Sequence, residues 1–184
     1  MLITTSRKPS PRTRSFTRSL ERVSNSKYIN RGKMSLRDVL LKSSDLNYIK
    51  VAVISQMKGN PSKLEIFNLD GDSLISMDIT VTNQLASGRI VKKKLHLRWE
   101  LNDSKSAFKD KIISILGIPE DPTDLIRGNN SLKRELKEHS NSNLILIKEG
   151  EDSKTVVEFT DQEGRITGPR IYIHKCLAGG LDAS

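Results

Sequence analysis

The stretch LITTSRKPSPRTRSFTRSLERV, residues 2–23, predicts how the fold begins. Residues 1–6 are typical of a short strand. Ser10 followed by Pro11 is typical of a helix start, because serine caps a helix N-terminus and proline fits its first position. We therefore expect a strand that is followed at once by a helix.

The predicted helix has two chemically different faces. At 100° per residue, its apolar side chains cluster on one face and its arginines on the opposite face. The apolar face consists of Phe16, Leu20 and Val23, and the arginine face of Arg14, Arg18 and Arg22. One helix thus offers a face for packing and a face for phosphate groups, because guanidinium groups contact phosphates through two hydrogen bonds.

Positive charge is concentrated around this helix. Residues 1–37 hold ten Lys or Arg and one acid, Glu21, whereas the remaining 147 residues hold 21 of each sign, so the net charge of +9 lies in the first fifth. The packing of a protein core gains nothing from such a concentration of positive charge. We interpret it as a signal of the partner, and a polyanion such as nucleic acid is the common one.

Composition excludes several classes of protein. The 184 residues fit one domain or two half-domains with a shared core, and the apolar runs are too short to span a membrane. No secretory signal is apparent at the start. A lone Cys176 and three scattered histidines predict neither a disulfide nor a metal site. Aromatic residues are scarce, which argues against a platform that stacks single-stranded RNA.

Apolar periodicity and turn residues place the other elements. In the first half we expect a helix capped by Ser35 and strands over residues 48–56, 64–69 and 74–82. In the second half we expect strands over residues 94–101, 144–148, 155–159 and 170–175, and helices over residues 105–116 and 132–139.

The second half repeats the order of the first. EIFNLDG with Phe67 aligns with VEFTDQEG with Phe159, 92 positions later, and the buried strands near Val51 and Ile145 differ by 94. We interpret this as a faint duplication into two α/β halves, each a small sheet with two helices. A chance match of the two patterns stays open.

Three separated motifs resemble the Brix family of ribosome-assembly proteins in its short archaeal form. They are residues 2–23, YINRGKMSLRDVL (28–40) and GRITGPRIYIHKC (164–176). The resemblance implies one Brix domain over residues 1–184, with halves 1–86 and 87–184, each akin to the anticodon-binding domain of class II aminoacyl-tRNA synthetases. It also implies a role in ribosome biogenesis.

We expect basic side chains from these motifs to contact RNA. Gly32 permits a sharp turn that presents Arg31 and Lys33, and the helix N-terminus at residues 11–13 offers amides to an anion. Gly168 and Pro169 have a structural role, and Arg170 beside them is the expected contact. The predicted RNA-binding residues are Arg7, Lys8, Arg12, Arg14, Arg18, Arg22, Arg31, Lys33 and Arg170. A merely solvated helix face is the alternative for the arginines.

A second basic cluster lies near the middle of the chain. Arg89, Lys92, Lys93, Lys94 and Arg98 alternate at their end with Leu95, Leu97 and Trp99. The charges line a solvent-facing side of a strand or protect a sheet edge from pairing with other chains.

No catalytic set, cofactor site or metal site is predicted. Gly32-Lys33 lacks the rest of a phosphate-binding P-loop, so a nucleotide cofactor is not expected. Asp70 and Asp72 flank a hairpin turn. Glu120, Asp121 and Asp124 follow a proline, and a two-metal nuclease built from such carboxylates stays open as a minor alternative.

We therefore expect a non-enzymatic factor that binds structured ribosomal RNA or its precursor and assists rRNA processing and subunit assembly. Pre-ribosomal proteins are possible partners, and neither a membrane nor a nucleotide is involved. The shortness of the chain favours an archaeal source and a cytoplasmic location, or the nucleolus in a nucleated cell. A protein scaffold with indirect RNA contact is the other alternative.

Overall fold

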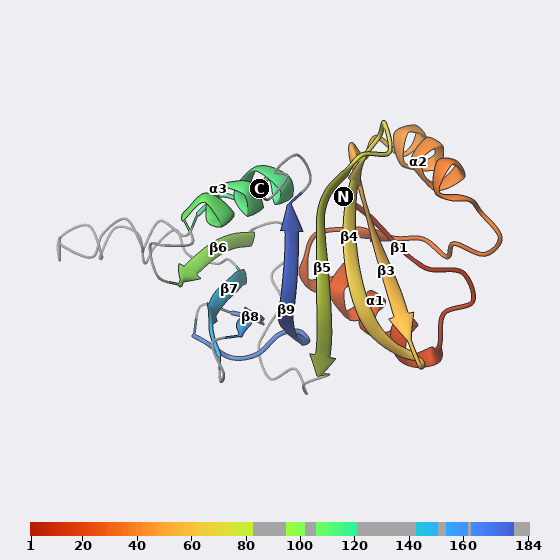
Figure 1. The fold of residues 1–184 in the computed structure, drawn as a ribbon. Coiled ribbons are helices and arrows are strands. Elements are labelled where there is room, and N and C mark those ends of the chain that lie inside the picture. The colour runs from red at the N-terminus through yellow and green to blue at the C-terminus, as the bar shows by residue number, and fades with distance from the viewer. Residues whose placement is uncertain (83–94, 102–105, 121–142, 151–153, 162, 179–184) are drawn as a thin grey trace. The chain divides into compact units, whose positions relative to one another are not determined.

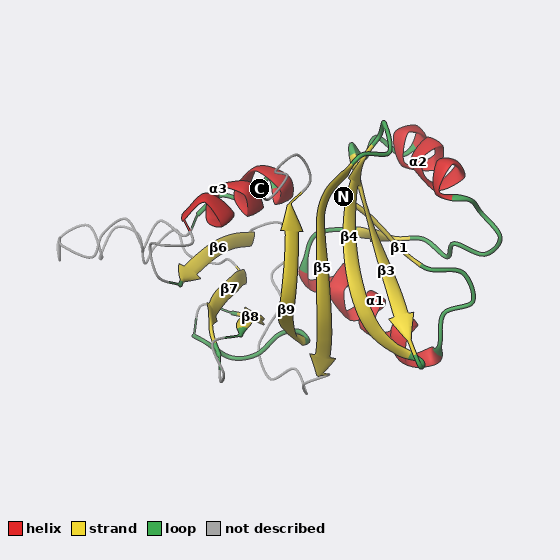
Figure 2. Cartoon of the chain, in the orientation of Figure 1, coloured by secondary structure: helices red, strands yellow, loops and turns green. Residues whose placement is uncertain are grey.

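The computed structural model describes residues 1–82, 95–101, 106–120, 143–150, 154–161 and 163–178 as a mixed α/β fold (Figures 1 and 2). Within these residues there are nine strands and three helices. They are β1 (Leu2–Thr5), α1 (Pro11–Val23), β2 (Lys27–Tyr28), α2 (Leu36–Asp45), β3 (Lys50–Met57), β4 (Asn60–Asn68), β5 (Ser73–Thr82), β6 (Leu95–Glu100), α3 (Ser106–Leu116), β7 (Asn143–Glu149), β8 (Thr155–Thr160) and β9 (Arg170–Ala178).

The chain divides into two compact units. The first unit comprises Met1–Asn83 together with Ile171–Ser184, and the second comprises Gln84–Arg170. The strand β9 groups with the first unit from Ile171 onward. The expected halves 1–86 and 87–184 stay predictions.

Strands of the first unit follow the order β2-β1-β3-β4-β5-β9. The strands β2, β1 and β3 are parallel, and β3, β4 and β5 form antiparallel hairpins. In the register of β1 with β3, Leu2 faces Val51 and Thr5 faces Ile54. All four residues of β1 are buried, because this parallel strand lies between β2 and β3 and is covered on both faces.

The helices α1 and α2 cover opposite faces of this sheet (Figure 1). Leu2, Val51 and Val53 form one core with Val39 and Leu40 of α2. Successive side chains of a strand point to opposite faces, so the other face carries the intervening residues. These are Ile3, Ala52 and Ile54, all fully buried, on the face covered by α1 with its fully buried Phe16.

Both helix starts in the first unit are confirmed. The Ser10 side chain caps α1 by accepting a hydrogen bond from the Thr13 amide, with Pro11 at the first helical position. In α2, Ser35 and Asp38 form a reciprocal capping box. Hydrogen bonds from the Ser35 backbone and hydroxyl lower the pKa of Asp38, because they stabilise the charged carboxylate.

The sequence pattern did not predict β2. This strand has two residues, too few for a detectable period, and pairs in parallel with β1. The Tyr28 amide donates to the Glu21 carboxylate at 2.9 Å. The one acidic residue of the first 37 therefore fastens a strand to α1.

The second unit contains β6 parallel to β7, and β7 antiparallel to β8. In the β7–β8 ladder Ile145 faces Phe159, and in the β3–β4 ladder Val51 faces Phe67. Leu95 and Leu97 of β6 are buried, as alternation predicts, and Trp99 contacts Phe108 of α3 at a ring distance of 5.7 Å. The helix expected over residues 132–139 lies outside the described residues.

Candidate nucleic-acid interface

The helix α1 has the two faces that its sequence predicts. Its buried residues are Thr13, Phe16, Thr17, Leu20 and Val23, with Phe16 fully buried. Arg14, Arg18 and Arg22 are exposed on the opposite side. The three arginines therefore contribute nothing to the core.

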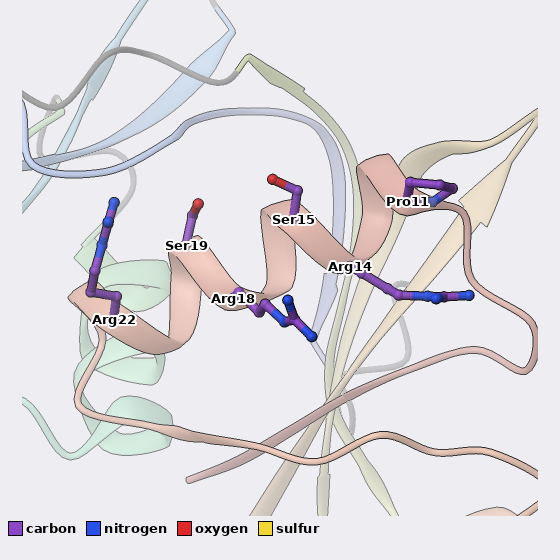
Figure 3. A pocket seen from close by; sticks show the side chains of 6 residues that line it. All are labelled: Pro11, Arg14, Ser15, Arg18, Ser19 and Arg22. Carbon is purple, nitrogen blue, oxygen red and sulfur yellow. The ribbon is translucent and has the colours of Figure 1, made fainter.

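These arginines line a shallow groove of about 510 Å³ on the outer surface of α1. Figure 3 shows their side chains spreading from successive turns of the helix, with the hydroxyl groups of Ser15 and Ser19 beside them. Four residues of helix rise about 6 Å, so the three groups form a row about 12 Å long. We call Arg14, Arg18 and Arg22 the arginine row.

The charge of the row is not neutralised by the residues that the structure describes, none of which forms an ion pair with it. The Arg14 guanidinium donates to the Pro9 carbonyl at 2.9 Å, which keeps its full charge. The carboxylate of neighbouring Glu21 instead accepts a hydrogen bond from the Tyr28 amide. Like charges four residues apart repel one another on a helix, so this arrangement is unfavourable for the free protein.

Several backbone amides at and near the N-terminus of α1, where an anion site is expected, have partners within the chain. Pro11 has no N–H, the Thr13 amide donates to Ser10, and the Arg14 amide donates to the Ser10 carbonyl. The amide of Ser10 itself donates to Gln56 at 2.7 Å. Exposed cationic side chains are therefore the main positive groups at this end of the helix, and the anion site at residues 11–13 stays a prediction.

Three further predicted contacts surround the start of α1. Arg7 and Lys8 are exposed in the loop after β1, and Arg12 is exposed in the first turn of the helix. Lys8 has a positive φ of 52°, a conformation uncommon for residues other than glycine.

The loop with Arg31 and Lys33 turns at Gly32, whose φ is +55°, as expected. Lys33 is exposed, whereas Arg31 is half-buried. The Arg31 guanidinium donates from Nε to the Met34 carbonyl at 3.2 Å and from Nη1 to the Thr5 carbonyl at 3.5 Å. Burial, and then the nearby charge of Arg7, lower the pKa of Arg31. Arg31 is thus held rigidly beside a like charge.

Arg170 belongs to the second unit, where it pairs with the carboxylate of Glu158. Glu158 is 5% exposed and also accepts from the Lys148 ammonium at 2.8 Å. Gly168 and Pro169 are buried beside it, in line with a structural role. The Arg170 guanidinium uses Nη2 for this pair, and its side chain is 31% exposed.

The second basic cluster is largely outside the described residues, which include only Arg98 of its five members. Arg98 is half-buried on β6 between the alternating Leu97 and Trp99. Neither explanation of this cluster, a solvent face or a protected edge, is decided.

Acidic residues in the described part of the chain do not gather into a metal site. Asp72 takes part in the turn after β4, where it bonds with Asn68 at 2.9 Å and 2.8 Å, and Gly71 has a φ of +95°. Glu120 pairs with Lys109 at 2.6 Å. Asp121 and Asp124 lie outside the described residues. No helix in the described segments is long and apolar enough to cross a membrane.

Sequence reasoning missed two residues near the start of α1. The Gln56 side-chain oxygen accepts from the Ser10 amide and from the Thr13 hydroxyl at 2.8 Å, which fastens the start of α1 to the end of β3. Lys58 follows in the β3–β4 turn with a φ of +50°. A glutamine inside a strand and a lysine in a turn carry no local signal of such a role.

Comparison with known proteins relates the chain to archaeal proteins. No family model matches it. A "Probable Brix domain-containing ribosomal biogenesis protein" of Methanothermobacter thermautotrophicus is 32% identical over 179 residues, which are 97% of this chain and 99% of the relative. A protein of the same name from Methanococcus maripaludis is 39% identical over 105 residues, 55% of this chain and 61% of the relative.

Two solved structures share the fold. One is Mil, described as an archaeal Imp4-like protein, with a TM-score of 0.70 and 28% identity over 97% of this chain and all of that one. The other is described as a probable ribosomal biogenesis protein from Aeropyrum pernix K1. It has a TM-score of 0.71 and 21% identity over 95% of this chain and 94% of that one, and it supports the fold alone.

Proposed function

Because the chain belongs to the family of Brix domain-containing ribosomal biogenesis proteins, we propose that it binds structured ribosomal RNA or its precursor and assists rRNA processing and subunit assembly without catalysis. The observation that carries the proposal is the arginine row, which is exposed, uncompensated within the described residues and opposite the buried face of α1. The proposed location is the cytoplasm.

The proposed mechanism is electrostatic clamping. The arginine row follows one stretch of phosphate backbone, and the exposed cations before and after it extend the contact. Bound phosphates relieve the repulsion within the row, so the rigid helix holds the RNA segment while the particle is assembled. The proposed contacts are Arg7, Lys8, Arg12, Arg14, Arg18, Arg22, Arg31, Lys33 and, in the second unit, Arg170.

A double-stranded or otherwise folded RNA fits this surface better than a free single strand. Recognition of single strands relies on aromatic side chains on which bases stack. In the described segments Phe16 and Phe159 are buried and Trp99 packs against Phe108. Arginine and serine side chains on α1 match contacts to phosphates and 2′-hydroxyls, which report RNA shape.

Replacing Arg14, Arg18 and Arg22 together by Ala tests the proposal. We expect the affinity for a pre-rRNA hairpin to fall about a hundredfold, and the slope of log affinity against log salt to become shallower by about 2 to 3, because three phosphate contacts are lost. Fluorescence anisotropy across a salt series measures both. The melting curve should be preserved, since the three side chains lie outside the core.

The matched control removes three exposed lysines elsewhere, Lys27, Lys42 and Lys175, by substitution with Ala. An equal loss in both variants would mean that net charge alone binds RNA. An unchanged affinity in the arginine variant would reject α1 as the interface. Crosslinking of the tagged protein to RNA in cells, followed by sequencing, would then name the bound segment.

One observation favours protein contacts as a second candidate function. A groove of about 500 Å³ lies between α2 and the β4–β5 turn, lined by Leu36, Leu40, Leu41 and Leu69 among others, and Leu41 is 59% exposed. A pre-ribosomal protein bound there would make the chain a scaffold. Retention of such a partner after nuclease treatment of an extract would support this reading, and its loss would favour RNA-mediated association.

The proposal includes a duplicated architecture. Matching registers, with Val51 facing Phe67 and Ile145 facing Phe159, support two halves that descend from one unit. The likeness of each half to the anticodon-binding domain of class II aminoacyl-tRNA synthetases, and the halves 1–86 and 87–184, stay predictions.

A further inference from the structure

Three parallel strands of the first unit end at the same edge of its sheet. From there β1 leads into α1 on one face, β2 leads into α2 on the other face, and β3 turns into β4. In open α/β sheets, ligands bind outside the carboxyl ends of the parallel strands, where connections leave toward opposite faces. This edge of the first unit has that topology.

The loops at this edge are basic. Residues 6–10 after β1 carry Arg7 and Lys8, residues 29–34 after β2 carry Arg31 and Lys33, and residues 58–59 after β3 carry Lys58. These three loops contain no acidic residue. The carboxylate of Asp38, which interacts electrostatically with Arg7, is already used by the Ser35 amide and hydroxyl in the capping box.

Arg31 is anchored between the end of β1 and the start of α2. Its two hydrogen bonds go to backbone carbonyls, Thr5 at the end of β1 and Met34 before α2, so its guanidinium has a fixed orientation. Arg7 lies close enough for its charge to lower the pKa of Arg31. An anion between the two guanidinium groups would turn the repulsion into two charge-assisted contacts.

The remaining two loops are fastened to each other. Gln56 donates to the Lys8 carbonyl at 3.4 Å and accepts from the Ser10 amide, while the Ser10 hydroxyl donates to the Gly59 carbonyl at 2.6 Å. Lys8 and Lys58 both have left-handed backbones, with φ of 52° and 50°. Lysine adopts this conformation at a cost, and such outliers persist where surrounding contacts fix them.

We propose that the carboxyl ends of β1, β2 and β3 form a second phosphate-binding site, contacted by Arg7, Arg31 and Lys58 and separate from the arginine row. The inference rests on the proposed function, because the phosphate belongs to the bound RNA. The group is a phosphodiester of the RNA backbone or a terminal phosphomonoester. The sequence analysis did not assign Lys58 to any site.

The experiment compares one pre-rRNA hairpin with a 5′-hydroxyl or a 5′-phosphate, bound by the full chain and by an Arg7→Gln/Lys58→Asn variant. Asparagine suits the left-handed backbone at position 58, and both side chains are exposed, so the fold should persist. We expect at least tenfold weaker binding and a salt slope shallower by 1 to 2. An Arg7→Lys/Lys58→Arg variant keeps the charges and should retain most of the affinity.

Both possible sources of the phosphate give a distinct result. Equal weakening for both hairpins supports a backbone phosphodiester, and weakening confined to the 5′-phosphorylated hairpin supports a terminal phosphate. Unchanged binding of both hairpins overturns the inference. If the Arg14/Arg18/Arg22 variant still loses affinity, only this second site fails, whereas unchanged binding in both variants rejects the proposed function itself.

Discussion

In the first unit β1 is followed by α1 and pairs in parallel with β3, which turns back into β4. In the second unit β6 is followed by α3 and pairs in parallel with β7, which turns back into β8. Their two first helices align at an offset of 92 residues, the same offset that relates Phe67 to Phe159. The helices α1 and α3 can therefore be compared residue by residue, on the side packed against the sheet and on the opposite side.

The apolar residues of the two helices correspond, and the exposed residues do not. Phe16, Leu20 and Val23 of α1 align with Phe108, Ile112 and Ile115 of α3. At the positions of Arg14, Arg18 and Arg22, the second unit has Ser106, Asp110 and Ser114. Packing against a sheet requires the apolar pattern but not the arginines. The fold therefore does not require the arginine row, which is consistent with its proposed role in RNA binding.

The most direct test of this comparison replaces the three arginines of α1 by the residues found at the matching positions of α3. In an Arg14→Ser/Arg18→Asp/Arg22→Ser variant we expect RNA affinity to fall more than a hundredfold, because one contact becomes repulsive. The free energy of unfolding should change by no more than about 0.5 kcal/mol, as for other surface substitutions, and relief of the repulsion offsets lost helix propensity. Denaturant melts and anisotropy test the two halves of this prediction. A strongly destabilised variant would show that the fold needs the row.

A second prediction concerns Arg170, the proposed RNA contact that belongs to the second unit. Arg170→Ala removes one of two cations around the buried Glu158, and we expect a loss of about 2 kcal/mol in unfolding free energy. A double variant that adds Glu158→Gln should recover part of the loss, because no buried charge is left unpaired. Denaturant titrations supply the values for the cycle. Full stability would contradict this prediction, and RNA binding by the same variant separately tests Arg170 as a proposed contact.

The smallest expected effect distinguishes the starts of α2 and α3. Asp38 caps α2, whereas the first turn of α3 has no acidic residue. Since folding lowers the pKa of Asp38, its contribution is present above the pKa of the unfolded chain and is lost as the pH falls through the lowered pKa. The protection factors of α2 amides, which correct for the intrinsic effect of pH on exchange, should therefore fall in acid, and Asp38→Ala should remove this dependence. Identical profiles in both proteins would contradict it, with α3 amides as the internal reference.

The features that sequence predicted well are local ones. The caps of α1 and α2 follow from Ser10-Pro11 and from Ser35, because capping involves residues close in sequence. The two faces of α1 follow from a period of 3.6 residues. Strand β5 was predicted from strict alternation, and its buried positions Ile75, Met77, Ile79 and Val81 agree.

The features that sequence missed depend on distant partners. Gln56 is 46 residues from Ser10, and β2 exists because its backbone bonds to β1 and to Glu21. The pairing of Arg170 with Glu158 likewise joins segments that carry no mutual signal. Of the candidate site, the arginine row could be predicted because one helix presents it. The proposed grouping of Arg7, Arg31 and Lys58 in one site could not be predicted, because it depends on how β1, β2 and β3 are arranged in the sheet.

The last strand, β9, belongs to the unit that the first residues of the chain begin. Its neighbour in the sheet is β5, and the His174 ring shares a hydrogen bond of 2.9 Å with the Thr80 hydroxyl. During translation, residues 1–82 leave the ribosome long before residues 171–178 exist. Until then β5 presents an unpaired edge, which other chains can join. The edge of β5 therefore stays unpaired until translation is almost finished. A fragment that stops near residue 86 should aggregate where the full chain does not.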